Sequence, residues 1–149
     1  MKASSFYFPF IILLFITNLI FGQCEVSFTS HSENAKINKS PFIISGTAKV
    51  PANSHVWVLV QVVGRGGWVP QGNGEVFIED DSTWDCEVYL GNTGDTGYYR
   101  IAIAVVNDKV NESLNNWVAR SRETREYPEI DFPSVIDGYS IKKIRLEKR

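Results

Sequence analysis

Two near-continuous apolar segments, residues 56–63 and 98–106, set the strongest limit on how this chain can fold. In the first segment, apolar side chains occupy both faces of an extended strand, from Val56 to Val63. Such a pattern is typical of a central strand that is covered on both sides or at its ends. The second segment has nearly the same character. We therefore expect two central β-strands in this domain.

The other extended segments alternate apolar and polar side chains with a period of two, which is typical of half-buried strands. The clearest of them are Cys24–Phe28, Phe42–Val50 and Trp84–Leu90. Shorter candidates between turn residues are Trp68–Pro70, Val76–Ile78 and Tyr139–Glu147. Pro70 limits its strand to a sheet edge. The polar stretch His31–Lys39 predicts a loop.

The periodicity changes after Asn107. Apolar side chains then recur at the spacing of one helix face, at Val110, Leu114, Trp117 and Val118. We expect Asp108 or Asn111 to cap the N-terminus, and Pro128 bounds the segment. The pattern predicts one helix over Val110–Glu126.

Together these segments predict an all-β domain. About seven short strands with turns between them favour a sandwich of two sheets. The helix falls between the last two strands, so we place it in the final crossover.

The N-terminus predicts a secretory signal peptide over residues 1–22. Lys2 precedes an apolar run from Phe6 to Phe21, which ends at the small residue Gly22. The run is shorter than a spanning helix of about 20 apolar residues and contains Pro9. We expect cleavage after Gly22, which leaves residues 23–149 as one domain. The alternative is an uncleaved N-terminal membrane anchor.

Cys24 and Cys86 are the only cysteines. In an oxidising compartment an even number suggests a disulfide, so we predict a Cys24–Cys86 bridge. In the second interpretation Cys24 is the lipid-modified first residue of a membrane-anchored lipoprotein. Gln23 stands where lipoprotein signals have a small residue, and lipidation would leave Cys86 alone. Free thiols are the third possibility.

Several short motifs resemble those of bacterial immunoglobulin-like modules of unknown function. They are Ser45-Gly46-Thr47 at a strand opening, Asp81-Ser82-Thr83-Trp84 at an acidic turn, and Gly97-Tyr98-Tyr99 before a central strand. The segment Gly64–Gln71 is similar to a Gly-Arg-aromatic-Pro-Gln signature of such modules. The resemblance covers roughly Val26 to Leu146 and implies that the domain at residues 23–149 is an immunoglobulin-like β-sandwich. Such modules are free-standing secreted proteins or appendages of larger ones. It implies no activity.

The predicted disulfide departs from the antibody pattern, in which the bridge joins two central strands beside a buried Trp. Here Cys24 lies on the first strand and Cys86 on the strand before the penultimate one. A bridge needs Cα atoms within about 7 Å of each other. Strands that face each other across the core can meet this condition. Two strands of one sheet with a third between them cannot.

The best candidate for a ligand site is the loop that contains Arg65, Trp68 and Gln71. These residues would offer a bidentate donor, an aromatic face and an amide within one turn. The competing interpretation is that the loop fastens its hairpin onto the sandwich, with no ligand. We expect the other tryptophans in the core, at Trp57, Trp84 and Trp117.

We expect no catalytic residue, metal or cofactor. His31 and His55 are the only histidines, and their spacing supports neither a zinc site nor a Ser-His-Asp triad. The carboxylates at Glu79–Asp81 favour a solvated turn over a calcium site. A formal charge of −2 gives no electrostatic reason to expect nucleic acid as a partner.

These observations predict a secreted, non-enzymatic binding or adhesion module. We expect it to contact carbohydrate or a surface protein through the loop at Arg65–Gln71. The alternative is a structural or accessory subunit of a cell-envelope assembly that binds no small ligand. A membrane enters only if Cys24 is lipidated or the signal is uncleaved.

Overall fold

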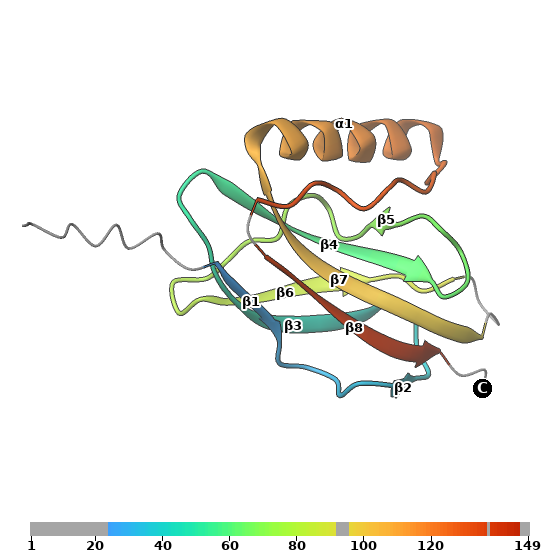
Figure 1. Ribbon diagram of the computed structural model, residues 1–149. Helices are drawn as coiled ribbons and strands as arrows, with labels where there is room; N and C mark the ends of the chain where they lie inside the picture. The colour runs from blue at the N-terminus through green and yellow to red at the C-terminus, as the bar shows by residue number, and fades with distance from the viewer. Residues whose placement is uncertain (1–23, 92–95, 137, 147–149) are drawn as a thin grey trace, which may run out of the picture.

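A computed structural model describes residues 24–91, 96–136 and 138–146 of the chain, which form a β-sandwich with one helix (Figure 1). The predicted signal peptide, residues 1–22, lies outside these described residues. Within them, no helix combines the length and the apolar character that crossing a membrane requires.

Eight strands form two sheets in the described part of the chain. The three-stranded sheet has the order β1–β3–β6, with bounds Glu25–Phe28, Phe42–Lys49 and Thr83–Val88. The five-stranded sheet has the order β2–β8–β7–β4–β5, with bounds Ala35–Ile37, Tyr139–Leu146, Gly97–Asn107, Ser54–Val62 and Val69–Pro70. By chain order β1, β3 and β6 match the A, B and E strands of immunoglobulin domains, and β8, β7, β4 and β5 match the G, F, C and C′ strands. The predicted immunoglobulin-like two-sheet sandwich is confirmed.

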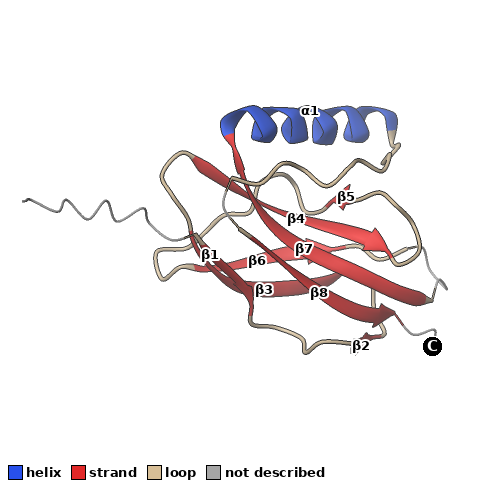
Figure 2. Ribbon diagram, in the orientation of Figure 1, coloured by secondary structure: helices blue, strands red, loops and turns tan. Residues whose placement is uncertain are grey.

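The two central strands, β4 and β7, are covered on both faces, as their apolar patterns predict. Val56, Val58 and Val60 of β4 join the core between the sheets. Trp57 and Leu59, in the opposite phase, join a second core on the outer face. Figure 2 shows that α1 lies across this outer face of the five-stranded sheet. Alternation along one strand therefore supplies two cores at once.

Helix α1 occupies Asp108–Thr124 in the connection between β7 and β8, which confirms the predicted helix in the last crossover. Its N-cap is Asn107, whose Oδ1 accepts from the Val110 N–H at 3.0 Å. The predicted caps, Asp108 and Asn111, are wrong, because both side chains bind residues of β4 instead. The helix ends where Arg125 adopts a left-handed conformation and its N–H donates to the Ser121 carbonyl.

Two short predicted elements are wrong. Ala35–Ile37 was expected in a loop but forms β2, which pairs in parallel with β8. Its partner lies far along the chain, so local sequence carries no signal for the pairing. Conversely, Val76–Ile78 forms no regular strand. Val76 instead donates its N–H to the Val56 carbonyl at 2.7 Å and extends the hydrogen bonding along the β4 edge.

The predicted Cys24–Cys86 disulfide is also wrong, since no bond joins the two sulfurs. Cys86 pairs with Ile44 of β3, whereas Cys24 directly precedes Glu25, which pairs with the far end of β3 at Lys49. The cysteines thus lie on opposite sides of β3 and about 20 Å apart along that strand, because Cys24 lies one residue beyond the Glu25–Lys49 pair. This separation exceeds by far what a disulfide can span.

Candidate functional site

A cavity of about 470 Å³ opens beside the edge strand β5, where the C-terminal half of α1 passes over the sheet. Its volume falls within the range of about 300–1,000 Å³ that is typical of small-molecule sites. We call it the β5 pocket. Its lining consists of Val60, Val62, Gly67, Val69, Pro70, Gln71, Gly72, Asn73, Tyr89, Gly91, Tyr99, Trp117, Val118, Arg122, Tyr127 and Glu129.

The apolar part of the lining comes from the sheet. Val60 and Val62 belong to β4, and Tyr99 to the start of β7. Val69 and Pro70 form β5, which pairs with β4 through Leu59 and Val60. Because β5 is only two residues long, it leaves the end of β4 uncovered, and the pocket forms there.

Aromatic side chains contribute a second part of the lining, at Tyr89, Trp117 and Tyr127. Tyr89 and Tyr127 remain 54 % and 59 % exposed. Trp117 is half-buried, and its indole N–H donates to the Pro128 carbonyl at 3.0 Å. The Trp117 and Tyr127 ring centroids lie 6.1 Å apart at a tilt of 59°. Trp117 therefore holds Tyr127 in place while the Tyr127 ring stays accessible.

Tyr89 follows directly after β6 and is held at both its backbone and its hydroxyl. The Tyr89 N–H donates to Gln71 Oε1 at 2.8 Å, and its hydroxyl donates to Glu87 Oε2 at 2.9 Å. The hydrogen bond to Glu87 is the largest cause that raises the pKa of Tyr89, with smaller contributions from desolvation, the Glu87 charge and Tyr127. Tyr89 thus stays a neutral phenol at neutral pH, within electrostatic range of Tyr127.

Polar groups complete the pocket. Arg122, in the last turn of α1, donates from Nη2 to the backbone carbonyl of Asn73 at 2.9 Å and to its Oδ1 at 3.1 Å. Glu129 lies 3.6 Å from Arg65, between Oε1 and Nη1. A Cβ at Gly67 would lie 2.3 Å from the Glu129 Cβ. Gly67 therefore allows the segment after α1 to approach the sheet and bring Glu129 to the pocket.

The three residues of the predicted ligand loop have different surroundings. Arg65 is exposed and faces Glu129. Gln71 lines the pocket but is buried, with its amide used on Val69 and Tyr89. It positions Tyr89 and the β5 edge.

Trp68 does not offer an exposed aromatic face, because only 6 % of it is accessible. Its N–H and carbonyl exchange two 2.8 Å hydrogen bonds with Ile130, and its ring packs edge-on against Phe132 at 5.1 Å. The prediction that Trp68 offers a face to a ligand is therefore wrong. Its contacts fit the competing interpretation, in which the loop fastens its hairpin onto the sandwich.

The sequence analysis named Gln71 but missed the rest of the pocket, including Tyr89, Trp117, Arg122 and Tyr127. Tyr89 carried one local signal, since it stands on the polar face of its strand, in phase with Asp85 and Glu87. The others come together only when α1 and the segment after it fold back over the sheet.

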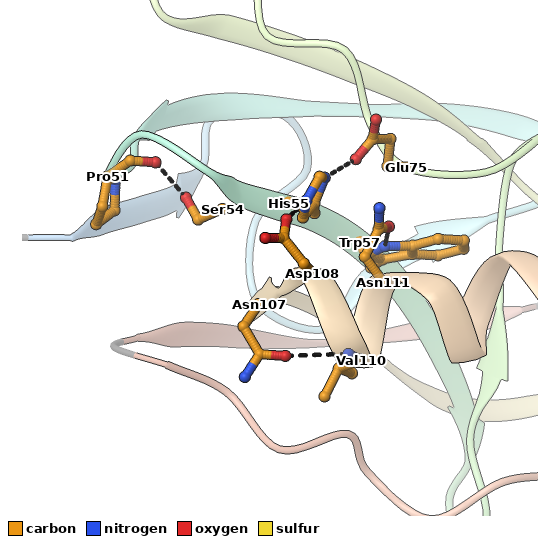
Figure 3. A network of polar contacts seen from close by, with 9 residues as sticks. All are labelled: Pro51, Ser54, His55, Trp57, Glu75, Asn107, Asp108, Val110 and Asn111. Carbon is orange, nitrogen blue, oxygen red and sulfur yellow. Dashed lines mark hydrogen bonds and ion pairs between the residues drawn. The ribbon is translucent and has the colours of Figure 1, made fainter.

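A second polar cluster surrounds His55, away from the pocket (Figure 3). The His55 Nδ1 contacts Glu75, and the His55 Nε2 lies 2.8 Å from Asp108 Oδ1 at the start of α1. The hydrogen bond to Asp108 is the largest cause that raises the pKa of His55, and Glu75 adds to it against the effect of desolvation. Both ring nitrogens are occupied, and the nearby Ser54 hydroxyl donates to the Pro51 carbonyl instead. The cluster fastens α1 to β4.

Among the residues that the structure describes, no three His, Cys, Asp or Glu side chains are placed to hold a metal ion.

Comparisons with known proteins give only distant structural likenesses. No protein-family model matches the sequence, and no curated protein resembles it. The chain is similar to the titin M3 domain, with 12 % identity over 85 % of this chain and 98 % of that one, at a TM-score of 0.37. Murine CRIg gives 10 % identity over 86 % and 99 % of the two chains, also at 0.37. The strand order of the two sheets alone carries the fold assignment.

Proposed function

We propose that this chain is a secreted, non-enzymatic binding module whose β5 pocket binds carbohydrate. The observation that carries the proposal is the presence of two exposed tyrosines, Tyr89 and Tyr127, on an apolar cavity with planar polar groups. Export rests on the signal-like residues 1–22.

The lining suits a saccharide. The face of a sugar ring that carries C–H groups packs against an aromatic ring, and its hydroxyls bind planar polar side chains. Tyr127 and Tyr89 supply accessible rings, while Asn73 and Arg122 supply amide and guanidinium groups beside them. Each is already held by neighbouring groups, which lowers the entropy lost on binding.

The proposal includes no catalytic step. In the described residues, His55 is held between two carboxylates, and the Tyr89 hydroxyl donates to Glu87. Neither group is arranged with a nucleophile as acyl or glycosyl transfer would need.

An oligosaccharide array followed by calorimetry on each hit tests the proposal. We expect Tyr127→Ala and Tyr89→Ala each to weaken binding about tenfold, the upper end for one aromatic contact. Phe77→Ala is the matched control, because Phe77 is an aromatic residue outside the pocket and 74 % exposed. Thermal melts verify that the variants fold.

Saccharide binding that survives both tyrosine substitutions would refute the pocket as the site. An array with no hits, together with a stoichiometric protein partner from the envelope fraction, would instead favour the accessory-subunit interpretation.

A further inference from the structure

The two charged side chains that line the β5 pocket have different partners. Among the described residues that line it, the charged ones are Arg122 and Glu129. Glu129 faces the guanidinium of Arg65 at 3.6 Å. Arg122 binds the neutral groups of Asn73. Glu129 thus faces a cation, whereas both hydrogen bonds of Arg122 go to an uncharged residue.

The guanidinium of Arg122 is fixed in place while much of it remains available. Both bonds to Asn73 start from Nη2, so they leave the donors on Nε and Nη1 outside those contacts. Asn73 lies in the loop that follows β5, and Arg122 lies in the last turn of α1. The two elements together hold the fork in one orientation, which reduces the entropy that a ligand must remove.

The guanidinium charge strengthens a hydrogen bond from Nε or Nη1 to a carboxylate. Beside the guanidinium lie the accessible ring of Tyr127 and the apolar surface of Val69 and Val118. An occupant that satisfies both parts has an uncharged ring with a C–H face and a carboxylate attached to it. A carboxylate would add a charge-assisted hydrogen bond to Arg122 that an uncharged sugar lacks.

The geometry points to a carboxylate-bearing saccharide, of the uronic-acid or sialic-acid class, as the ligand of the β5 pocket, with its carboxylate on Arg122 and its ring against Tyr127. This inference rests on the proposed function and names the ligand class for the same site.

The test uses pairs of oligosaccharides that contain uronic or sialic acid, each with its twin in which the carboxyl groups are reduced to alcohols. Calorimetry measures both members of a pair against the full mature protein. We expect the acidic member to bind about tenfold more tightly or better, because hydrogen bonds to a charged partner are the strong ones. Arg122→Gln should remove this difference, and Arg122→Lys, which keeps the charge but not the fork, should retain only part of it.

Arg120→Gln is the matched control, since Arg120 is an exposed arginine on the same helix that does not line the pocket. It should leave the preference unchanged.

Equal affinity for both members of each pair would overturn the inference. If Tyr127→Ala then abolished the binding of both members, carbohydrate binding at the β5 pocket would still be supported. Equal weakening by Arg122→Gln and Arg120→Gln would overturn it as well. If no saccharide binds, both proposals fail. Binding of an acidic peptide that depends on Arg122, without any saccharide binding, would replace the ligand class.

Discussion

Replacement of Trp68 by alanine tests whether this side chain stabilises the fold, as its burial indicates, or serves a ligand. Its ring is almost fully buried beneath the segment after α1, against Phe132. An aromatic side chain buries about 150–250 Å². At about 25 cal/mol per Å², this corresponds to about 4–6 kcal/mol as an upper bound. Measured costs of truncating a buried Trp or Phe to Ala are about 3–5 kcal/mol.

We therefore expect Trp68→Ala to lower the free energy of unfolding by about 3–5 kcal/mol. Urea denaturation followed by far-ultraviolet circular dichroism measures it, with the slope of the transition checked for two-state behaviour. Phe77→Ala is the control, and its exposed ring should cost at most about 0.5 kcal/mol. If Trp68→Ala also fell within about 0.5 kcal/mol of the unchanged protein, the ring would not be buried as described.

Two further predictions concern titratable groups. The pKa of His55 is raised by its carboxylate partners, so its stabilisation is complete below the ordinary value of 6.5 and is lost as the pH rises through the raised value. The free energy of unfolding should fall by no more than about 1 kcal/mol as the pH rises across this interval. His55→Gln should abolish this pH dependence, and the same dependence in that variant would contradict the contacts. Burial raises the pKa of the Cys86 thiol to about 12, so maleimide at pH 8 should modify Cys86 only after denaturation, and native modification would contradict its burial. The intact mass should correspond to two thiols, and a mass lower by two hydrogens would contradict the strand order.

The apolar pattern of the central strands was sufficient to predict most of the fold. Alternation along β4 placed valines on one face and Trp57 with Leu59 on the other, and both faces proved to be covered. The helical spacing likewise located α1. These signals are local, because a residue two or four positions away shares the same face.

The errors arose where the outcome depends on distant partners. The disulfide depended on strand order, and β3 lies between the strands that carry Cys24 and Cys86. The burial of Trp68 depended on its pairing with Ile130, which lies far along the chain, after β6, β7 and α1. The β5 pocket takes residues from the five-stranded sheet, from the loops after β5 and β6, from α1 and from the segment after it, so no single stretch of sequence displays it.

Helix α1, in the last crossover, forms one wall of the β5 pocket. Its first turn is fastened to β4 through Asp108 and Asn111. Its C-terminal half supplies Trp117 and Arg122 to the pocket. A plain short connection between β7 and β8 would leave the end of β4 without this wall.

The most direct test of the central claim, that the β5 pocket is the binding site, is a titration of isotope-labelled protein with an acidic saccharide, followed by amide chemical shifts. We predict that the shifts concentrate at Gly67, Gly72, Asn73 and Tyr89, together with the last turns of α1. Shifts confined to the outer face of the three-stranded sheet, around Ile43 and Asp85, would contradict the account.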